Sequence, residues 1–469
     1  MSRISLNNVD LAWLRMESPT NPMMITVAVH FRGRINYDQL IANLKVSLVR
    51  YRRFRQRIVR PRKIFSRPYW EDSPNYRVED HVELLDLPSP ADDTALQEAV
   101  NKKMNTTLDF AHPLWKLTVV DNYPEGSVII VSVHHCIADG ISLVQVLLQM
   151  ALTSNIEPVK QSSVDDLIGN ESQAEREPAI IEIAQQDFDR SEALQTISPS
   201  ESPKPTSQTN RGTLYTNPPI TEIIAAAARI IFRRPDPPTI LKGRLGKIKK
   251  VVSSEPFSLP EIKRIAQINH ATINDILMAV ASGAIQRYLD LHNEKPKRNI
   301  RAFILVNMRG RSIDEELGNK FGLVFLTLPL DRKLPQERLG EIKQSMDRLK
   351  MSAEYAATYV ILNILGWMPG WIEHLATLIL DTKGTVVATN VPGPRQQLYL
   401  AGAPITSIEA WVPQSGRIGV GLSFVSYNDQ MFVGLNVDAE LVPDPEIFLK
   451  LFTEEFESFQ ADLSVSTLE

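Results

Sequence analysis

A Ser-, Thr- and Pro-rich stretch interrupts the middle of the chain. The segment TISPSESPKPTSQTNRG (196–212) is almost free of large apolar residues, and acidic residues precede it. This composition is typical of a linker. Because a chain of 469 residues also exceeds the usual size of one domain, we expect an N-terminal domain over 1–155, a partly disordered linker with a possible amphipathic helix over 156–240, and a C-terminal domain over 241–469.

Strand and helix patterns alternate on both sides of this stretch, which predicts an α/β fold. In the first half, MMITVAVHF (23–31) reads as a strand, 37–51 as a helix, and 114–135 as two strands joined by a Pro-Glu-Gly turn. In the second half, 258–292 predicts two helices, the first capped by Ser258. Five further strands are expected there: 301–309, 321–330, 384–393, 417–428 and 431–441.

Composition narrows the class of protein. Hydrophobic residues make up 43% and charged residues 23%, as in an ordinary globular protein, and the net charge of -4 argues against a general nucleic-acid binder. Cys136 is the single cysteine, so no intramolecular disulfide or cysteine metal cluster is expected. The start of the chain lacks the unbroken apolar core of a signal peptide. We expect a cytoplasmic protein.

Two histidines follow an apolar strand in VIIVSVHHCIADGISLVQVLL (128–148). Partial burial favours neutral imidazole, which can act as a base. Asp139 is close enough along the turn to orient a ring or brace the loop, and Gly140 permits a backbone conformation that side chains forbid. The alternative is a hydrogen-bonded structural histidine, but the combination of residues favours chemistry.

The segment HHCIADG (134–140) resembles the H-H-x-x-x-D-G motif of the CoA-dependent acyltransferase superfamily. Further segments occur in the order found in the bacterial-type wax ester synthase/acyl-CoA:diacylglycerol acyltransferase family: ESPTNPMMITVAVHF, HPLW, TINDILMAV, LGNKFG and TNVPGP. The resemblance covers nearly the whole chain, and the acidic and Ser/Pro-rich stretch is the departure from it. It implies two chloramphenicol-acetyltransferase-like α/β sandwich domains with an active-site tunnel between them.

The resemblance also implies roles for individual residues. His135 would be the general base, His134 would support it, and Asp139 would hold the loop. Asn274 is a candidate for polarising the thioester carbonyl, although a helix cap or a buried structural amide explains it equally well. The resemblance implies that the remaining matching residues contact substrate: Pro113, Leu114, Trp115, Gly140 and Asp275.

The implied activity is transfer of a long acyl group from acyl-CoA to diacylglycerol or a long-chain fatty alcohol. Since Cys136 should face away from His135 on an extended strand, we expect direct transfer and a packing role for Cys136. No cofactor or metal is expected; acyl-CoA is a co-substrate. The alternatives are an acyltransferase with a small or polar acceptor, and a non-catalytic lipid-binding protein of the same fold.

Three segments allow more than one interpretation. The basic run from Arg50 to Arg67 is read first as a solvated face, with CoA phosphates or anionic lipid as alternatives. The apolar stretches Tyr359 to Leu380 and Ile220 to Pro235 are unsuited to spanning a membrane, and Pro369-Gly370 breaks the first into two helices. Core packing and contact with a lipid surface are weighed equally for both segments. Because diacylglycerol and fatty alcohols partition into bilayers, we expect the protein to associate peripherally with a membrane or lipid droplet.

Overall fold

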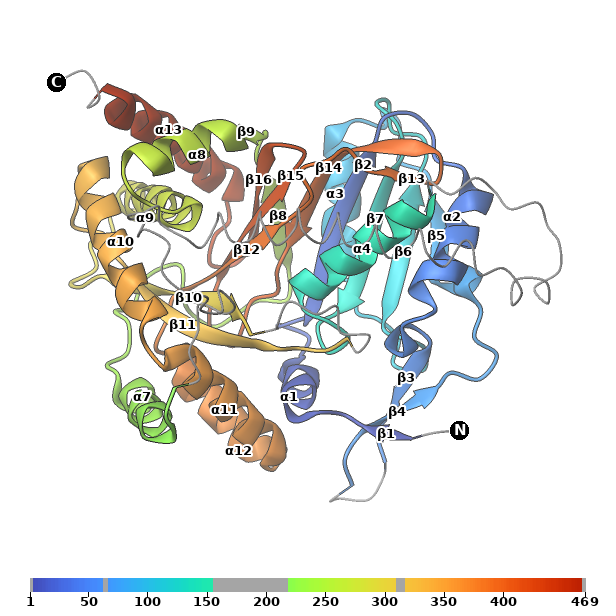
Figure 1. Ribbon diagram of the computed structural model, residues 1–469, viewed down its shortest axis with the longest axis horizontal. Coiled ribbons are helices and arrows are strands. Elements are labelled where there is room, and N and C mark those ends of the chain that lie inside the picture. The colour runs from blue at the N-terminus through green and yellow to red at the C-terminus, as the bar shows by residue number, and fades with distance from the viewer. Residues whose placement is uncertain (1–2, 62–65, 155–217, 309–316, 466–469) are drawn as a thin grey trace, which may run out of the picture.

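Two mixed β-sheets dominate the computed structural model, which describes residues 3–61, 66–154, 218–308 and 317–465 (Figure 1). The first sheet has six strands in the order β13-β14-β2-β7-β6-β5. Its central strands are apolar on both faces, which suits strands covered on both sides. The bounds are β2 (Met24–Phe31), β5 (Val82–Leu85), β6 (Trp115–Val120), β7 (Val128–His134), β13 (Tyr399–Leu400) and β14 (Ala403–Trp411).

The second sheet has seven strands, in the order β11-β10-β12-β15-β16-β8 with β9 paired to β16. Every residue of β15 is buried, so this sheet too is covered on both faces. Its strands are β8 (Lys249–Ser253), β9 (Phe257–Ser258), β10 (Ile300–Asn307), β11 (Phe321–Leu328), β12 (Val386–Pro392), β15 (Val420–Tyr427) and β16 (Gln430–Asp438).

One part of the chain crosses from the second half into the first. β14 pairs antiparallel with β2 over Ile405 to Trp411, and β13 extends the same edge. Residues of the expected C-terminal domain therefore complete the N-terminal sheet, so the sheets do not divide at residue 240. Pairing satisfies backbone groups of β2 that would otherwise form an open edge.

Helices cover the sheets in two groups. Around the first sheet lie α2 (Tyr37–Asn43), which continues as a π-helix over Leu44–Leu48, α3 (Asp93–Met104) and α4 (Gly140–Ser154). Against the second sheet lies α9 (Ile273–Leu291), which is apolar almost all round and therefore buried between α8, α10 and α13. The bounds of these three are α8 (Leu259–Ile268), α10 (Pro335–Lys350) and α13 (Pro445–Val465).

A further group of helices lies below the second sheet in Figure 1. α11 (Glu354–Trp367) packs against α1 (Asn8–Met16), α7 (Ile220–Phe232) and α12 (Gly370–Asp381). None of the helices that the structure describes combines the length and apolar composition that a membrane span requires. The remaining elements are a small sheet of β1 (Ile4–Ser5), β4 (Tyr69–Asp72) and β3 (Gln56–Val59), with 3₁₀ turns at Arg52–Phe54 and Val78–His81.

Local patterns located the elements correctly. Each strand expected in the second half is present, Ser258 caps α8 by accepting a hydrogen bond from the backbone N–H of Glu261, and Pro369 separates α11 from α12. Only residues 218–240 of the expected linker can be compared with the structure, because residues 155–217 lie outside the described part of the chain. Its amphipathic helix is α7, which buries Ala226 and Ile230.

Candidate active site

The end of β7 brings the two histidines to the boundary between the halves. His134 is the last residue of the strand and pairs with Met24, and the backbone N–H of His135 donates to the carbonyl of Met23 at 2.8 Å. The helix that follows, α4, contacts both β13 of the first sheet and β12 of the second. The motif is therefore held by both halves of the chain.

Asp139 braces the turn between β7 and α4. Its Oδ1 accepts hydrogen bonds from the backbone N–H and the hydroxyl of Ser142, at 3.0 and 2.7 Å, and its Oδ2 accepts one from the N–H of Lys320 at 3.2 Å. This geometry agrees with the expected loop-holding role. Gly140 differs from expectation: it is the first residue of α4 with no left-handed backbone angle, and a Cβ there would only touch Val391, at 3.4 Å.

The ring of His135 is enclosed by aromatic side chains. Trp13 stacks on it with ring centroids 4.1 Å apart and planes 9° from parallel, and the Phe321 ring lies 6.0 Å away. Burial lowers the pKa of His135 to about 4, because the enclosed imidazolium would lose its hydration. The imidazole is therefore neutral at pH 7, which is the form that accepts a proton.

Sequence reasoning missed the polar residues that support this ring. Asn319 places its Oδ1 3.0 Å from Nδ1 of His135 and donates through Nδ2 to Oδ1 of Asp10 at 2.8 Å. Asp10 forms an ion pair with Arg53. Asp10 could have been recognised from the sequence, since it is a charged residue among the buried apolar residues of α1. The interpretation of the basic run from Arg50 to Arg67 as a solvated face is wrong for Arg53, which lies inside this network.

His134 has separate partners. Its Nδ1 accepts a hydrogen bond from the backbone N–H of Cys136 at 3.1 Å, and its Nε2 is bound to the carboxylate of Glu17. With Nδ1 acting as acceptor, the proton is on Nε2 and is shared with Glu17. Both ring nitrogens are thus occupied by the protein, which suits the supporting role expected for His134.

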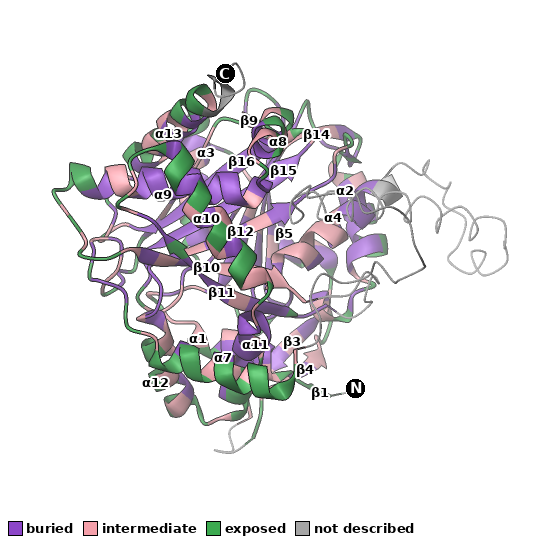
Figure 2. Cartoon of the chain, turned by 60° about the vertical axis from the view of Figure 1, so that its left-hand side comes forward, coloured by how far each residue is buried: buried purple, intermediate pink, exposed green. Residues whose placement is uncertain are grey.

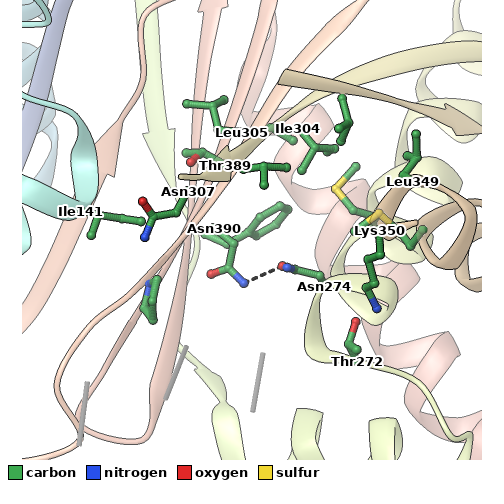
Figure 3. Close-up of a pocket in the computed structure, with 17 residues that line it drawn as sticks. Ile141, Thr272, Asn274, Ile304, Leu305, Asn307, Leu349, Lys350, Thr389 and Asn390 are labelled. Carbon is green, nitrogen blue, oxygen red and sulfur yellow. Dashed lines mark hydrogen bonds between the residues drawn. The ribbon is translucent and has the colours of Figure 1, made fainter. Parts of the chain in front are cut away.

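Asn274 lies at the start of α9 and faces a cavity (Figure 3). Its Oδ1 accepts a hydrogen bond from Nδ2 of Asn390 at 2.6 Å. The helix cap is Thr272, in a reciprocal capping box with Asp275, so the cap interpretation of Asn274 is wrong. Among the described residues the Nδ2 group of Asn274 has no partner, which leaves its N–H groups available to a carbonyl oxygen.

Two cavities approach the histidine loop. The first is lined by Asn274, Asn390 and Lys350, together with Ile141, which follows the motif in α4. The second is lined mostly by apolar side chains of α1, α11, α12 and the sheet strands β10–β12. Trp13 and Phe321, which pack on His135, form part of its wall. Leu305 lines both cavities.

Comparisons with known proteins agree with this arrangement. Residues 6–277 match the wax ester synthase/diacylglycerol acyltransferase catalytic domain, and residues 317–460 match the WS/DGAT C-terminal domain. The chain belongs to this family. "O-acyltransferase WSD" of Acinetobacter baylyi is 24% identical over 84% of this chain and 83% of its own. "Probable diacyglycerol O-acyltransferase tgs1" of Mycobacterium tuberculosis is 22% identical over 94% and 92%.

Solved structures show the same fold. The wax ester synthase/diacylglycerol acyltransferase from Marinobacter aquaeolei VT8 superposes with a TM-score of 0.64 at 18% identity, covering 98% of this chain and 100% of that one. The first condensation domain of the calcium-dependent antibiotic synthetase gives a TM-score of 0.63 at 13% identity, covering 98% and 96%. The expected two-domain acyltransferase fold is therefore confirmed.

Four of the residues expected to contact substrate lie in the protein core or in a helix cap. Leu114 and Trp115 are buried in the first core, where the indole N–H of Trp115 donates to the carbonyl of Phe54 at 2.7 Å. Pro113 is buried beside them, and none of the three lines either cavity described above. The carboxylate of Asp275 is fully buried in the helix cap. These positions fit packing and capping roles, and contact of these residues with substrate stays a prediction.

Cys136 is fully buried, and burial raises the pKa of its thiol well above the ordinary value, so the nucleophilic thiolate is disfavoured. We expect Cys136→Ala to retain most of the activity and to lower the free energy of unfolding by about 1 kcal/mol, the cost of a small cavity. Denaturant unfolding and initial rates measure both. Mass spectrometry that trapped an acyl group on Cys136 would contradict direct transfer.

Proposed function

We propose that this family member transfers a long-chain acyl group from acyl-CoA to the hydroxyl of diacylglycerol or a long-chain alcohol. The observation that carries the proposal is the placement of His135: its ring packs on Trp13 and Phe321, and both side chains line the apolar cavity. A general base whose ring packs against the wall of an apolar chamber suits an acceptor whose hydroxyl is attached to hydrocarbon.

In the proposed mechanism, Nε2 of His135 removes the hydroxyl proton as the acceptor oxygen attacks the thioester carbon. The carbon–sulfur bond then breaks, and the CoA thiolate takes the proton from the imidazolium. Asn274 would donate a hydrogen bond to the carbonyl oxygen as negative charge develops on it. The aromatic enclosure of His135 limits access of water, which would otherwise compete with the alcohol as acceptor.

CoA release tests this proposal directly. Purified protein is mixed with palmitoyl-CoA alone, with hexadecanol or with dioleoylglycerol, and free thiol is followed over time. Release that depends on either lipid, with formation of the matching ester, supports the proposal. Release that requires a small polar acceptor instead would favour the second acyltransferase hypothesis, and binding of lipid without any release would indicate a non-catalytic lipid-binding protein.

We further propose that the protein docks peripherally on a lipid surface. Exposed apolar residues lie on α7, α11 and α12. These helices form the lower edge of the molecule in Figure 2. This apolar face comprises Ile220, Ile224, Ile231, Phe232, Val360, Ile364, Trp367, Trp371, Leu375, Leu378 and Ile379. Other residues of α11 and α12 line the second cavity, so these helices separate the chamber from the apolar face.

Two of the three arginines in and just after α7 are free to contribute positive charge beside this face. Arg229 and Arg234 are exposed. Arg233 is half-buried: it pairs with Glu354, and its guanidinium lies 4.7 Å from the ring centroid of Phe325, which lines the chamber. Arg233 is thus a structural residue, and of these three arginines we propose that Arg229 and Arg234 meet lipid headgroups.

We expect the double variant Trp367→Ser/Trp371→Ser to lose most of its binding to liposomes at high salt. Both indoles are exposed, at 71% and 72%, and apolar insertion persists where salt screens charge. Arg229→Glu/Arg234→Glu should weaken binding at low salt to liposomes that contain anionic lipid. Co-sedimentation measures both effects.

Leu291→Ser/Met351→Ser is the matched control, because these side chains are exposed at 56% and 90% outside the apolar face. The control should bind liposomes like the wild type, and every variant should keep its activity on a detergent-dispersed acceptor. Equal losses in the tryptophan variant and this control would mean that the apolar face is not the docking surface.

A further inference from the structure

We infer that Asn319 is a positioning residue that holds the ring of His135 in the tautomer and orientation required of a general base. The inference rests on the proposed role of His135 as that base. Four segments converge on this point: α1 with Asp10, the 3₁₀ turn with Arg53, the loop after β7 with His135, and the segment before β11 with Asn319.

The orientation of the Asn319 amide follows from its own partners. Its Nδ2 donates to Oδ1 of Asp10 at 2.8 Å and to the carbonyl of His135 at 2.7 Å. A flipped amide would place its oxygen against two acceptors. Oδ1 must therefore face Nδ1 of the His135 ring, at 3.0 Å, and a carbonyl oxygen there requires Nδ1 to carry the proton. Nε2 is left with its lone pair, ready to accept a proton.

Asp10 fixes Asn319 in turn. The Asp10 side chain is fully buried, and its Oδ1 also accepts the backbone N–H of Asn319 at 3.2 Å. Its Oδ2 binds Asn7 Nδ2 at 2.7 Å and pairs with Arg53. Arg53 closes the network by donating to the carbonyl of Cys136 at 3.1 Å, the residue after the base. A chain of charge-assisted contacts thus starts and ends on the motif loop.

The network also joins the two halves. Asn319 holds His135, and the next residue, Lys320, donates its backbone N–H to Asp139 at 3.2 Å. Two consecutive residues of the second half therefore contact both functional ends of the motif in the first half. A correctly oriented base requires that the halves be assembled.

The test is Asn319→Leu, which keeps similar volume and removes both functions of the amide. We expect kcat to fall by about 10- to 100-fold, part of the roughly 10²–10⁴-fold that general-base assistance supplies, while KM for palmitoyl-CoA changes little. Because Asp10 acts through Asn319, Asp10→Leu should also lower kcat, and the double variant should be no slower than Asn319→Leu alone.

Histidine ¹⁵N NMR gives a readout that does not depend on activity. In the labelled wild-type protein, with the signal of His135 identified by its loss in His135→Gln, we expect a protonated Nδ1 and an unprotonated Nε2. A His135 ring protonated at Nε2 would overturn the inference. This measurement still decides the question if Asp10→Leu fails to fold.

Asn436→Leu is the control for a merely structural effect. It removes another buried amide, which donates to the carbonyl of Val412 at 2.8 Å in the second sheet, and it should lower stability with little change in kcat. A loss in Asn319→Leu no greater than in this control would refute the positioning role. Activity in His135→Ala would instead refute the base itself, so the two failures are distinguishable.

Discussion

Replacing His135 with alanine is expected to lower kcat by about 10²-fold or more, because the variant has no group at this position that can remove the acceptor's proton. The fold should survive, since the hydrogen bonds of the residue 135 backbone with Met23 and Asn319 do not depend on the imidazole. His134→Ala should cost less activity, because His134 is engaged by Glu17 and the backbone of Cys136. Initial rates with palmitoyl-CoA and hexadecanol measure both. Near-normal turnover in folded His135→Ala protein would falsify the assignment of the base.

The pH profile gives a second measure of His135. Its pKa is lowered to about 4 by burial, so protonation removes the base only as the pH falls towards that value. We expect kcat/KM to stay level from about pH 8 down to pH 6 and to decline below about pH 5, whereas a histidine with an ordinary pKa would lose half its activity near pH 6.5. An acid limb centred near pH 6.5 would show that the ring is more hydrated than its enclosure indicates.

Asn274→Ala should produce the other large effect, a fall in kcat of about 10²-fold, similar to the loss of one oxyanion-hole donor. Asn274 lines the first cavity, and its Nδ2 group has no partner among the described residues, so it would be available to a thioester carbonyl that develops negative charge there. Such a donor acts mainly in the transition state, so KM should change less than kcat. Single-turnover rates with palmitoyl-CoA separate binding from chemistry.

Asn390→Ala is the graded comparison for this prediction. It removes the hydrogen bond that holds the Oδ1 of Asn274 but keeps the donor itself, so we expect a smaller loss of kcat than in Asn274→Ala. If Asn274→Ala turned over like the wild type, the buried structural amide that remains as the alternative would be the correct interpretation of Asn274.

Local patterns were sufficient to locate the elements and the motif. The near-continuous apolar runs of β2 and β7, the Ser258 cap and the Pro369 break act within a few residues, so their effect is readable without knowledge of the fold. The histidine loop was found because its residues are neighbours in the chain. Contacts of Asp139 with Ser142, three residues away, belong to the same local class.

What supports the base was decided by the tertiary structure. Asn319 is 184 residues from His135 and 309 from Asp10, and no periodicity links positions so far apart. The same reason explains why Leu114 and Trp115 proved to be core residues and why β14 joined the first sheet. The sequence by itself identified the family and the candidate residues for acyl transfer, whereas only the packing of the two halves decided which side chains surround His135, because burial and hydrogen-bond geometry arise from contacts between distant segments.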